Sequence, residues 1–201
     1  KVVGLVGAGA QARTQLMALL NLYGRLEEVR VWSRSEATRE KYVSEMKPLC
    51  EGRAEIRPVG NVKDAVTDAD IIVTTTPSRR PIVSDEWVSK GTHINCIGAD
   101  APGKEELDPS ILKRAKIYID DWEQGLHSSE INVPITKGII TKDVVIGELG
   151  EVIAGLKPGR TSTDEITIFT STGLAVQDAV TAKLVYDKAL ANNLGFWIEL
   201  L

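Results

Sequence analysis

Short runs of aliphatic and β-branched residues alternate with longer segments of helical periodicity along the whole chain. The predicted strands cover residues 2–6, 29–32, 55–58, 71–75, 93–97, 117–119 and 166–169. The predicted helices cover residues 10–22, 36–49, 62–67, 109–113, 147–155 and, as the longest, 174–193. Such strict alternation is typical of parallel strands joined by right-handed crossovers.

The segments VVGLV (2–6) and IIVTTT (71–76) are apolar on both faces, as strands covered by helices on both sides are. The sequence therefore predicts an α/β fold, a doubly wound parallel sheet of the Rossmann type, over residues 1–195. The last residues, FWIELL (196–201), follow Gly195, a residue type that often ends a helix. We expect them to form a terminal strand that pairs with a second domain outside this chain.

Composition narrows the choice of partners. The 201 residues are 43% hydrophobic and 26% charged, which is ordinary for a soluble domain, and the formal net charge is −4. That charge weighs against nucleic acid or an anionic membrane as a partner. Cys50 and Cys96 lie far apart without a CxxC pair, which favours a reduced, cytoplasmic setting. No metal-ligand spacing is present in the sequence, so no metal site is predicted.

A glycine-rich turn lies between the first predicted strand and the first predicted helix, in GLVGAGAQARTQ (4–15). In such a turn Gly7 permits the bend, Gly9 lets the backbone approach a pyrophosphate, and small Ala12 allows close packing of helix on strand. The N–H groups at the helix start, at Ala10 and Gln11, attract phosphate oxygens. We predict a dinucleotide site here in preference to a plain strand-to-helix connection.

The end of the second predicted strand, VRVWSRS (29–35), bears on the choice of dinucleotide. A carboxylate there would bind the ribose 2′-hydroxyl of NAD, but the chain has Ser33, Arg34 and Ser35. Arg34 can pair with a 2′-phosphate, and the serines can donate hydrogen bonds to it. The plainer interpretation is that Ser35 caps the helix that begins at Glu36 and that Arg34 is solvated, and both interpretations can hold at once. The cofactor is thus predicted as NAD(P), with NADP favoured.

Three further segments complete a recognisable pattern: TTTPSRRPIV (74–83), GTHINCIGADAPGKEELDPSIL (91–112) and GEVIAGLKPGRTSTDEITIFTSTGLAVQDA (150–179). With the glycine turn, they resemble the ornithine cyclodeaminase/mu-crystallin family, most closely its archaeal alanine dehydrogenase branch, over essentially the whole chain. The resemblance implies a cofactor domain inside a larger, homodimeric subunit whose N-terminal domain binds the substrate. The start at Lys1, directly on a predicted strand, fits that expectation. The segment WSRS departs from the branch, which tends to carry an acidic residue there.

The resemblance assigns Asp100 to the place beside the substrate amine. Asp100 follows a predicted strand at its carboxyl end, where open α/β sheets bind ligands, and a carboxylate there can accept a proton. Gly98 helps to shape the turn that presents it. The alternative is a turn residue that bonds its own backbone.

Two further segments are expected to border the cofactor. The loop after the fourth predicted strand does so in the family, and here it contains Thr75, Thr76, Pro77 and Ser78. Ser171, Thr172 and Gly173 begin the long predicted helix, so their N–H and hydroxyl groups can meet the nicotinamide or a phosphate, or simply cap the helix.

Four acidic residues follow the strand at 117–119. We interpret them as a solvated face, or as a rim facing a second domain, rather than as a metal site. They are Asp120, Asp121, Glu123 and Glu130.

Three functions are compatible with this pattern. The favoured one is an NAD(P)-dependent dehydrogenase or imine reductase acting on a small amino or imino acid, with Asp100 assisting proton transfer. The second is ornithine cyclodeaminase, a lyase that forms proline and ammonia. The third is an NADPH-binding protein resembling mu-crystallin. Retention of Asp100 argues against binding alone.

Overall fold

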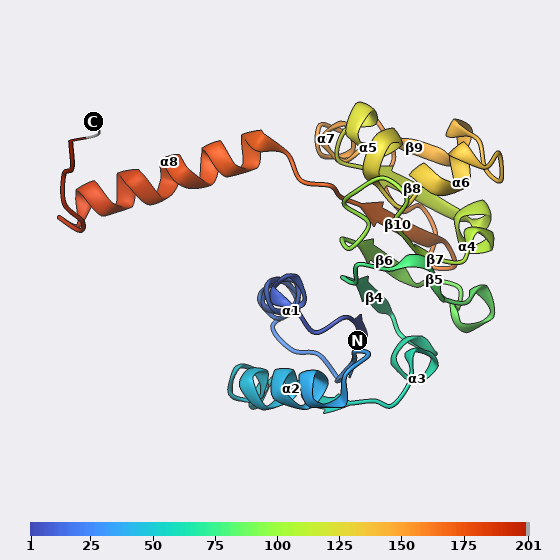
Figure 1. Cartoon of the computed structure of the whole chain (residues 1–201), viewed down its shortest axis with the longest axis horizontal. Coiled ribbons are helices and arrows are strands. Elements are labelled where there is room, and N and C mark those ends of the chain that lie inside the picture. Colours follow the sequence, from blue (N-terminus) through green and yellow to red (C-terminus); the bar gives the residue numbers. More distant parts are fainter. Residues whose placement is uncertain (200–201) are drawn as a thin grey trace.

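The computed structural model describes residues 1–199 and confirms the doubly wound α/β fold (Figure 1). Eight strands form one sheet in the order β3-β2-β1-β4-β6-β10-β8-β9, and every pairing in it is parallel. Its strands are β1 (Val2–Val6), β2 (Glu28–Trp32), β3 (Glu55–Pro58), β4 (Ile71–Thr74), β6 (His93–Cys96), β8 (Ala115–Ile119), β9 (Val145–Glu148) and β10 (Ile166–Thr170). The last strand along the chain, β10, is therefore not at an edge but between β6 and β8.

Helices connect these strands. They are α1 (Ala10–Tyr23), α2 (Glu36–Cys50), α3 (Val62–Val66), α4 (Pro109–Arg114), α5 (Trp122–Ser128), α6 (Asn132–Thr136), α7 (Leu149–Ile153) and α8 (Ala175–Ala191), with single 3-10 turns at Asp85–Trp87 and Lys142–Val144. Two short strands, β5 (Arg79–Val83) and β7 (Glu105–Leu107), form a separate parallel pair.

The core consists of two clusters because successive side chains of a strand point to opposite faces of the sheet. In β1, Val3 and Leu5 pack into the cluster that includes residues of α1 and α2. Val6 packs into the other cluster, with residues of α3, α4 and the far strands. Both clusters are almost wholly removed from water. Burial on both faces explains why the central strands β1 and β4 carry no polar face in the sequence.

All seven predicted strands and all six predicted helices are present, but short elements were missed. The predicted helix at 147–155 was wrong at its start, since Val145–Glu148 form β9 and α7 begins only at Leu149. Glu148 ends the strand and forms a capping box with Glu151. The missed α5 and α6 contain Gly125 and Pro134, residue types that disfavour helix in a sequence pattern.

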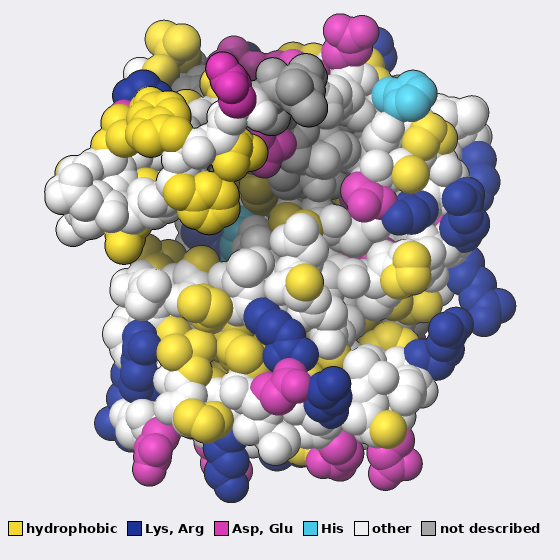
Figure 2. All heavy atoms as spheres, turned by 60° about the vertical axis from the view of Figure 1, so that its left-hand side comes forward, with side chains coloured by type: hydrophobic (Ala, Val, Ile, Leu, Met, Phe, Trp, Pro, Cys, Tyr) yellow, Lys and Arg dark blue, Asp and Glu magenta, His cyan; other side chains and the backbone are white. Residues whose placement is uncertain are grey.

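Helix α8 extends away from the sheet and buries none of its residues (Figure 1). Its exposed side chains include Val180, Leu184 and Val185, and large apolar side chains continue to Ile198. Hydrophobic side chains gather on the end of the molecule where α8 projects (Figure 2). Residues 196–199 form no strand, so the predicted terminal strand is absent from the described part of its range, and Leu200 and Leu201 lie outside the described residues. Its pairing with a second domain stays a prediction.

Two further observations concern residues 1–199 together. Cys50 and Cys96 are both buried and both free. Among the helices of residues 1–199, none combines the length and the apolar character that crossing a bilayer requires.

Candidate functional site

The segments predicted to form the site meet at one rim of the sheet, where the carboxyl ends of β2, β1, β4, β6 and β10 lie side by side. Backbone hydrogen bonds link each strand end to the next across this rim: Gly7 N–H to Trp32 O (2.9 Å), Thr75 N–H to Val6 O (2.8 Å), Gly98 N–H to Thr74 O (3.1 Å) and Ser171 N–H to Cys96 O (3.1 Å). The order of the sheet thus brings together five segments that are far apart in sequence. Open α/β sheets bind ligands at this edge.

The glycine turn has the conformation that its sequence predicts. Gly7 is buried and has φ +118°, a value that L side chains rarely adopt. A Cβ at Gly7 would also overlap the hydroxyl of Thr75, so the turn and the loop after β4 are in contact there. Ala12 is fully buried, and its carbonyl accepts a hydrogen bond of 2.8 Å from the hydroxyl of Tyr42 on α2.

The start of α1 fits an anionic ligand. Gly9 is the N-cap of α1, and a Cβ added to it would meet no atom within 4 Å. No acidic residue lies in the first turn, and Gly9, Ala10 and Gln11 are exposed. The first N–H groups of a helix lack partners within the helix, and its dipole favours negative charge there. This turn therefore offers the space and the donors that a pyrophosphate requires.

Of the predictions for the residues after β2, the helix cap at Ser35 is confirmed, whereas the Ser33 hydroxyl is not free to meet a phosphate. Ser33 is buried, and its hydroxyl donates to the carbonyl of Ser35 (2.8 Å), so it is directed into the turn. Ser35 caps α2 by accepting a hydrogen bond from the N–H of Thr38. Arg34 is exposed, and the sequence pattern missed a second guanidinium: Arg39, one turn along α2, donates to the carbonyl of Ser33 (3.3 Å).

The loop after β4 carries Thr75, Thr76, Pro77 and Ser78, and its hydroxyl groups have protein partners. Thr75 donates to the carbonyl of Val6 (3.5 Å), and Ser78 donates to the carbonyl of Arg80 (2.6 Å). Thr76 donates its hydroxyl to a carboxyl oxygen of Glu106 (2.7 Å). These side chains shape the loop, and their contribution to cofactor binding stays a prediction.

Asp100 lies in the loop after β6, with about half of its side chain exposed. The ammonium group of Lys104 contacts its carboxylate, a partner that the sequence analysis did not identify. Gly98, whose Cα packs against the backbone of Thr76, begins this loop. Arg79, the first residue of β5, donates to the carbonyl of Pro102 (3.3 Å), so β5 also supports the loop that carries Asp100.

Ser171, Thr172 and Gly173 follow β10 but do not cap α8, whose N-cap is Leu174. The prediction that they begin the helix was wrong. The hydroxyl of Ser171 (2.9 Å) and the N–H groups of Thr172 (2.7 Å) and Gly173 (2.9 Å) all donate to one carboxylate oxygen of Asp120. Asp120 therefore shapes this segment and is not part of a solvated face.

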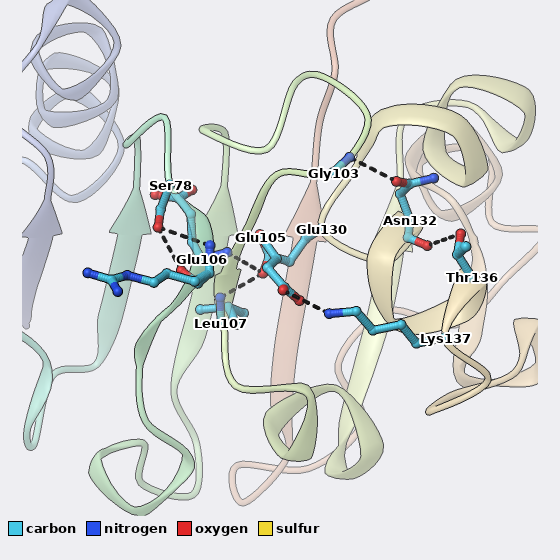
Figure 3. A network of polar contacts seen from close by, with 10 residues as sticks. Ser78, Gly103, Glu105, Glu106, Leu107, Glu130, Asn132, Thr136 and Lys137 are labelled. Atoms are coloured by element: carbon cyan, nitrogen blue, oxygen red, sulfur yellow. Dashed lines mark hydrogen bonds and ion pairs between the residues drawn. The ribbon is translucent and has the colours of Figure 1, made fainter.

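Glu130 was also predicted to lie on a solvated face or on a rim facing a second domain, and this prediction is wrong. Glu130 is fully buried below the rim, together with Glu106 of β7, which the sequence analysis did not single out (Figure 3). Burial raises the pKa of the Glu130 carboxyl well above its usual range, and it also raises the pKa of Glu106. No sequence signal indicated this pair, because Glu106 stands beside Glu105 in the segment EEL and Glu130 lies 24 residues further along the chain.

Comparison with known proteins agrees with these features. The family model of the ornithine cyclodeaminase/mu-crystallin family matches residues 1–193. The chain is 51% identical over 198 residues to alanine dehydrogenase of Archaeoglobus fulgidus, a match that covers 98% of this chain and 60% of that protein. The chain thus spans about three fifths of the length of that relative.

Two solved structures show the same fold. One, an archaeal alanine dehydrogenase dimer with bound NAD, matches with a TM-score of 0.91 at 49% identity, covering 100% of this chain and 61% of that one. The other, Δ1-pyrroline-2-carboxylate reductase of Thermococcus litoralis with NADH and L-proline, matches with a TM-score of 0.93 at 37% identity, covering 98% and 61%. From its sequence, its fold and these relatives, the chain belongs to the ornithine cyclodeaminase/mu-crystallin family.

Proposed function

We propose that this chain is the cofactor-binding part of an NAD(P)-dependent oxidoreductase that acts on the C–N bond of a small amino acid or of the corresponding imino acid. The observation that carries the proposal is the placement of Asp100 on the same rim as the open glycine turn at Gly9. The similarity to alanine dehydrogenase and to a pyrroline-carboxylate reductase supports it. When bound, the nicotinamide would supply or accept the hydride.

Different residues of the chain would then bind the cofactor and transfer the proton. The N–H groups at the start of α1 would bind the pyrophosphate, and the glycines would let it approach the backbone. Asp100 would hold or accept the proton that the substrate nitrogen or an attacking water releases. Lys104, whose ammonium group contacts the Asp100 carboxylate, would help to hold that carboxylate in place.

For the cofactor, we propose a preference for NADP over NAD. The relatives with bound cofactor hold NAD or NADH. In this chain, residues 33–35 include no carboxylate that could bind a ribose hydroxyl. Arg34 and Arg39 lie after β2, where their guanidinium groups could bind a 2′-phosphate.

We further propose that residues 1–195 form the dinucleotide domain of a longer, homodimeric, cytoplasmic subunit. The chain covers only 60% of its alanine dehydrogenase relative, and the solved archaeal alanine dehydrogenase is a dimer. The exposed apolar side chains of α8 and of residues 194–198 would pack against the remaining domain. The substrate carboxylate and side chain would be bound there.

Turnover by the full-length subunit tests this proposal. We expect oxidation of alanine, or reduction of a small imino acid, with stoichiometric change in NAD(P)H absorbance. Release of ammonia and proline from ornithine without net change in the cofactor would instead indicate the cyclodeaminase, and cofactor binding without any turnover would indicate a binding protein. Activity of residues 1–201 alone would contradict the need for a second domain.

A further inference from the structure

Two carboxyl groups lie buried directly below the rim, and each has one well-bonded oxygen (Figure 3). One oxygen of Glu130, Oε1, accepts hydrogen bonds from the N–H groups of Glu106 (2.8 Å) and Leu107 (2.7 Å). One oxygen of Glu106, Oε1, accepts from the N–H and the hydroxyl of Thr76, both at 2.7 Å. Glu130 thus holds the backbone of β7, and Glu106 holds the loop after β4.

The second oxygen of each carboxyl is buried and has no hydrogen-bond partner among residues 1–199. Glu106 Oε2 lies against Gly98, because a Cβ built on that glycine would overlap it. Leaving a buried acceptor unpaired costs free energy, and an unpaired buried charge costs more. A proton on one of the two carboxyls would remove one of these two unpaired buried charges.

No cation pairs with Glu106 or Glu130 among residues 1–199, so a bound proton is what would neutralise the charge of this pair. The nearby cation Lys137, which directly follows α6, pairs with Glu105 (3.3 Å), the neighbour of Glu106 in β7. On β6, burial and both glutamates raise the pKa of the Cys96 thiol, which therefore stays neutral. Two buried carboxyls that influence each other electrostatically, as these do, resist ionising together, so that one of them keeps a proton.

We propose that Glu106 and Glu130 hold one proton between them, with Glu130 as the carboxylic acid and Glu106 as the carboxylate. Glu106 is then also a positioning residue for the loops at the rim of the sheet where the cofactor would bind. Through Thr76 and its contact with Gly98, Glu106 joins the loop after β4 to the loop that carries Asp100. Only the positioning role rests on the proposed function; the shared proton does not.

Infrared spectroscopy of the chain tests the shared proton without any cofactor. At pH 7 we expect the C=O band of a protonated carboxylic acid in the unmodified chain, its loss in Glu130→Gln, and its retention in the matched control Glu105→Gln. The native state then binds a proton that the unfolded chain releases above about pH 4.3. The free energy of unfolding should accordingly fall as pH rises above that value, and less so in Glu130→Gln. Absence of the band in the unmodified chain would overturn the shared proton, whether or not the variants fold.

Cofactor affinity tests the positioning role. We expect Glu106→Ala to weaken NADPH binding by about tenfold, the effect of losing one hydrogen bond to a charged group. Glu106→Gln keeps an acceptor for Thr76 and should restore affinity to within about threefold of the unmodified chain. A folded Glu106→Ala with unchanged affinity would overturn the positioning role, as would equal losses in the Ala and Gln variants. An unmodified chain that binds neither cofactor would overturn the proposed function and the positioning role together, while the infrared band still decides the shared proton.

Discussion

Replacement of Asp100 by Asn is expected to slow turnover of the full-length subunit by about 10²–10⁴-fold, the range for loss of a positioned acid–base group. Asparagine preserves the size of the side chain and its capacity to bond the turn, but it cannot accept the proton from the substrate nitrogen. Because Asp100 lies in the loop after β6 and not in the glycine turn, we expect cofactor affinity to stay near that of the unmodified protein.

The matched control is Asp164→Asn. Asp164 is exposed and precedes β10, at the opposite end of the sheet, so its loss should leave turnover unchanged. Steady-state kinetics with a direct measurement of cofactor affinity separates the two effects. Ordinary turnover in Asp100→Asn would reduce Asp100 to a residue that shapes its own turn.

Replacement of Arg34 by Ala is expected to weaken NADPH binding by about 10- to 150-fold and NADH binding little. The contact with a 2′-phosphate is a charge-assisted hydrogen bond, of about 1.5–3 kcal/mol, and each 1.4 kcal/mol changes affinity tenfold. Arg34 is exposed, so added salt should screen the pair and reduce the NADPH loss. Titration of the chain with both cofactors at two salt concentrations measures this.

Arg25→Ala serves as the control for net charge, since Arg25 is also exposed but precedes β2 at the other end of the sheet. Equal affinity of the unmodified chain for NADH and NADPH would mean that Arg34 is solvated and that Ser35 acts only as a helix cap. In that case the proposed preference for NADP would be wrong, whereas the dinucleotide site itself would be unaffected.

The parts of the site that depend on local sequence could be predicted, because their chemistry is contained in a few neighbouring residues. The turn from Gly7 to Ala12 is one of them: a positive φ, an open N-cap and a small packed residue each demand a particular residue type. The cap at Ser35 is another.

The contacts between distant segments could not be predicted. Asp120 and Ser171 are 51 residues apart and meet only because β10 lies between β6 and β8. Likewise, Glu106 in β7 and Glu130 between α5 and α6 lie in segments whose sequence pattern indicates exposed acidic residues, and only the tertiary fold buries them. Charged side chains are almost never fully buried without a partner, so a sequence pattern assigns them to the surface by default.

We infer that the glycine turn at the start of α1 binds the pyrophosphate of a dinucleotide. The most direct test is a titration with NADPH, monitored by the fluorescence of the cofactor, of the unmodified chain and of the variants Gly9→Val and Gly150→Val. A Cβ at either glycine meets no protein atom within 4 Å, so both variants can keep the fold. We expect saturable binding by the unmodified chain and by Gly150→Val, and binding at least about tenfold weaker in Gly9→Val, because the valine fills the space of the ligand. Absence of binding by the unmodified chain, or full affinity in Gly9→Val, would contradict the account.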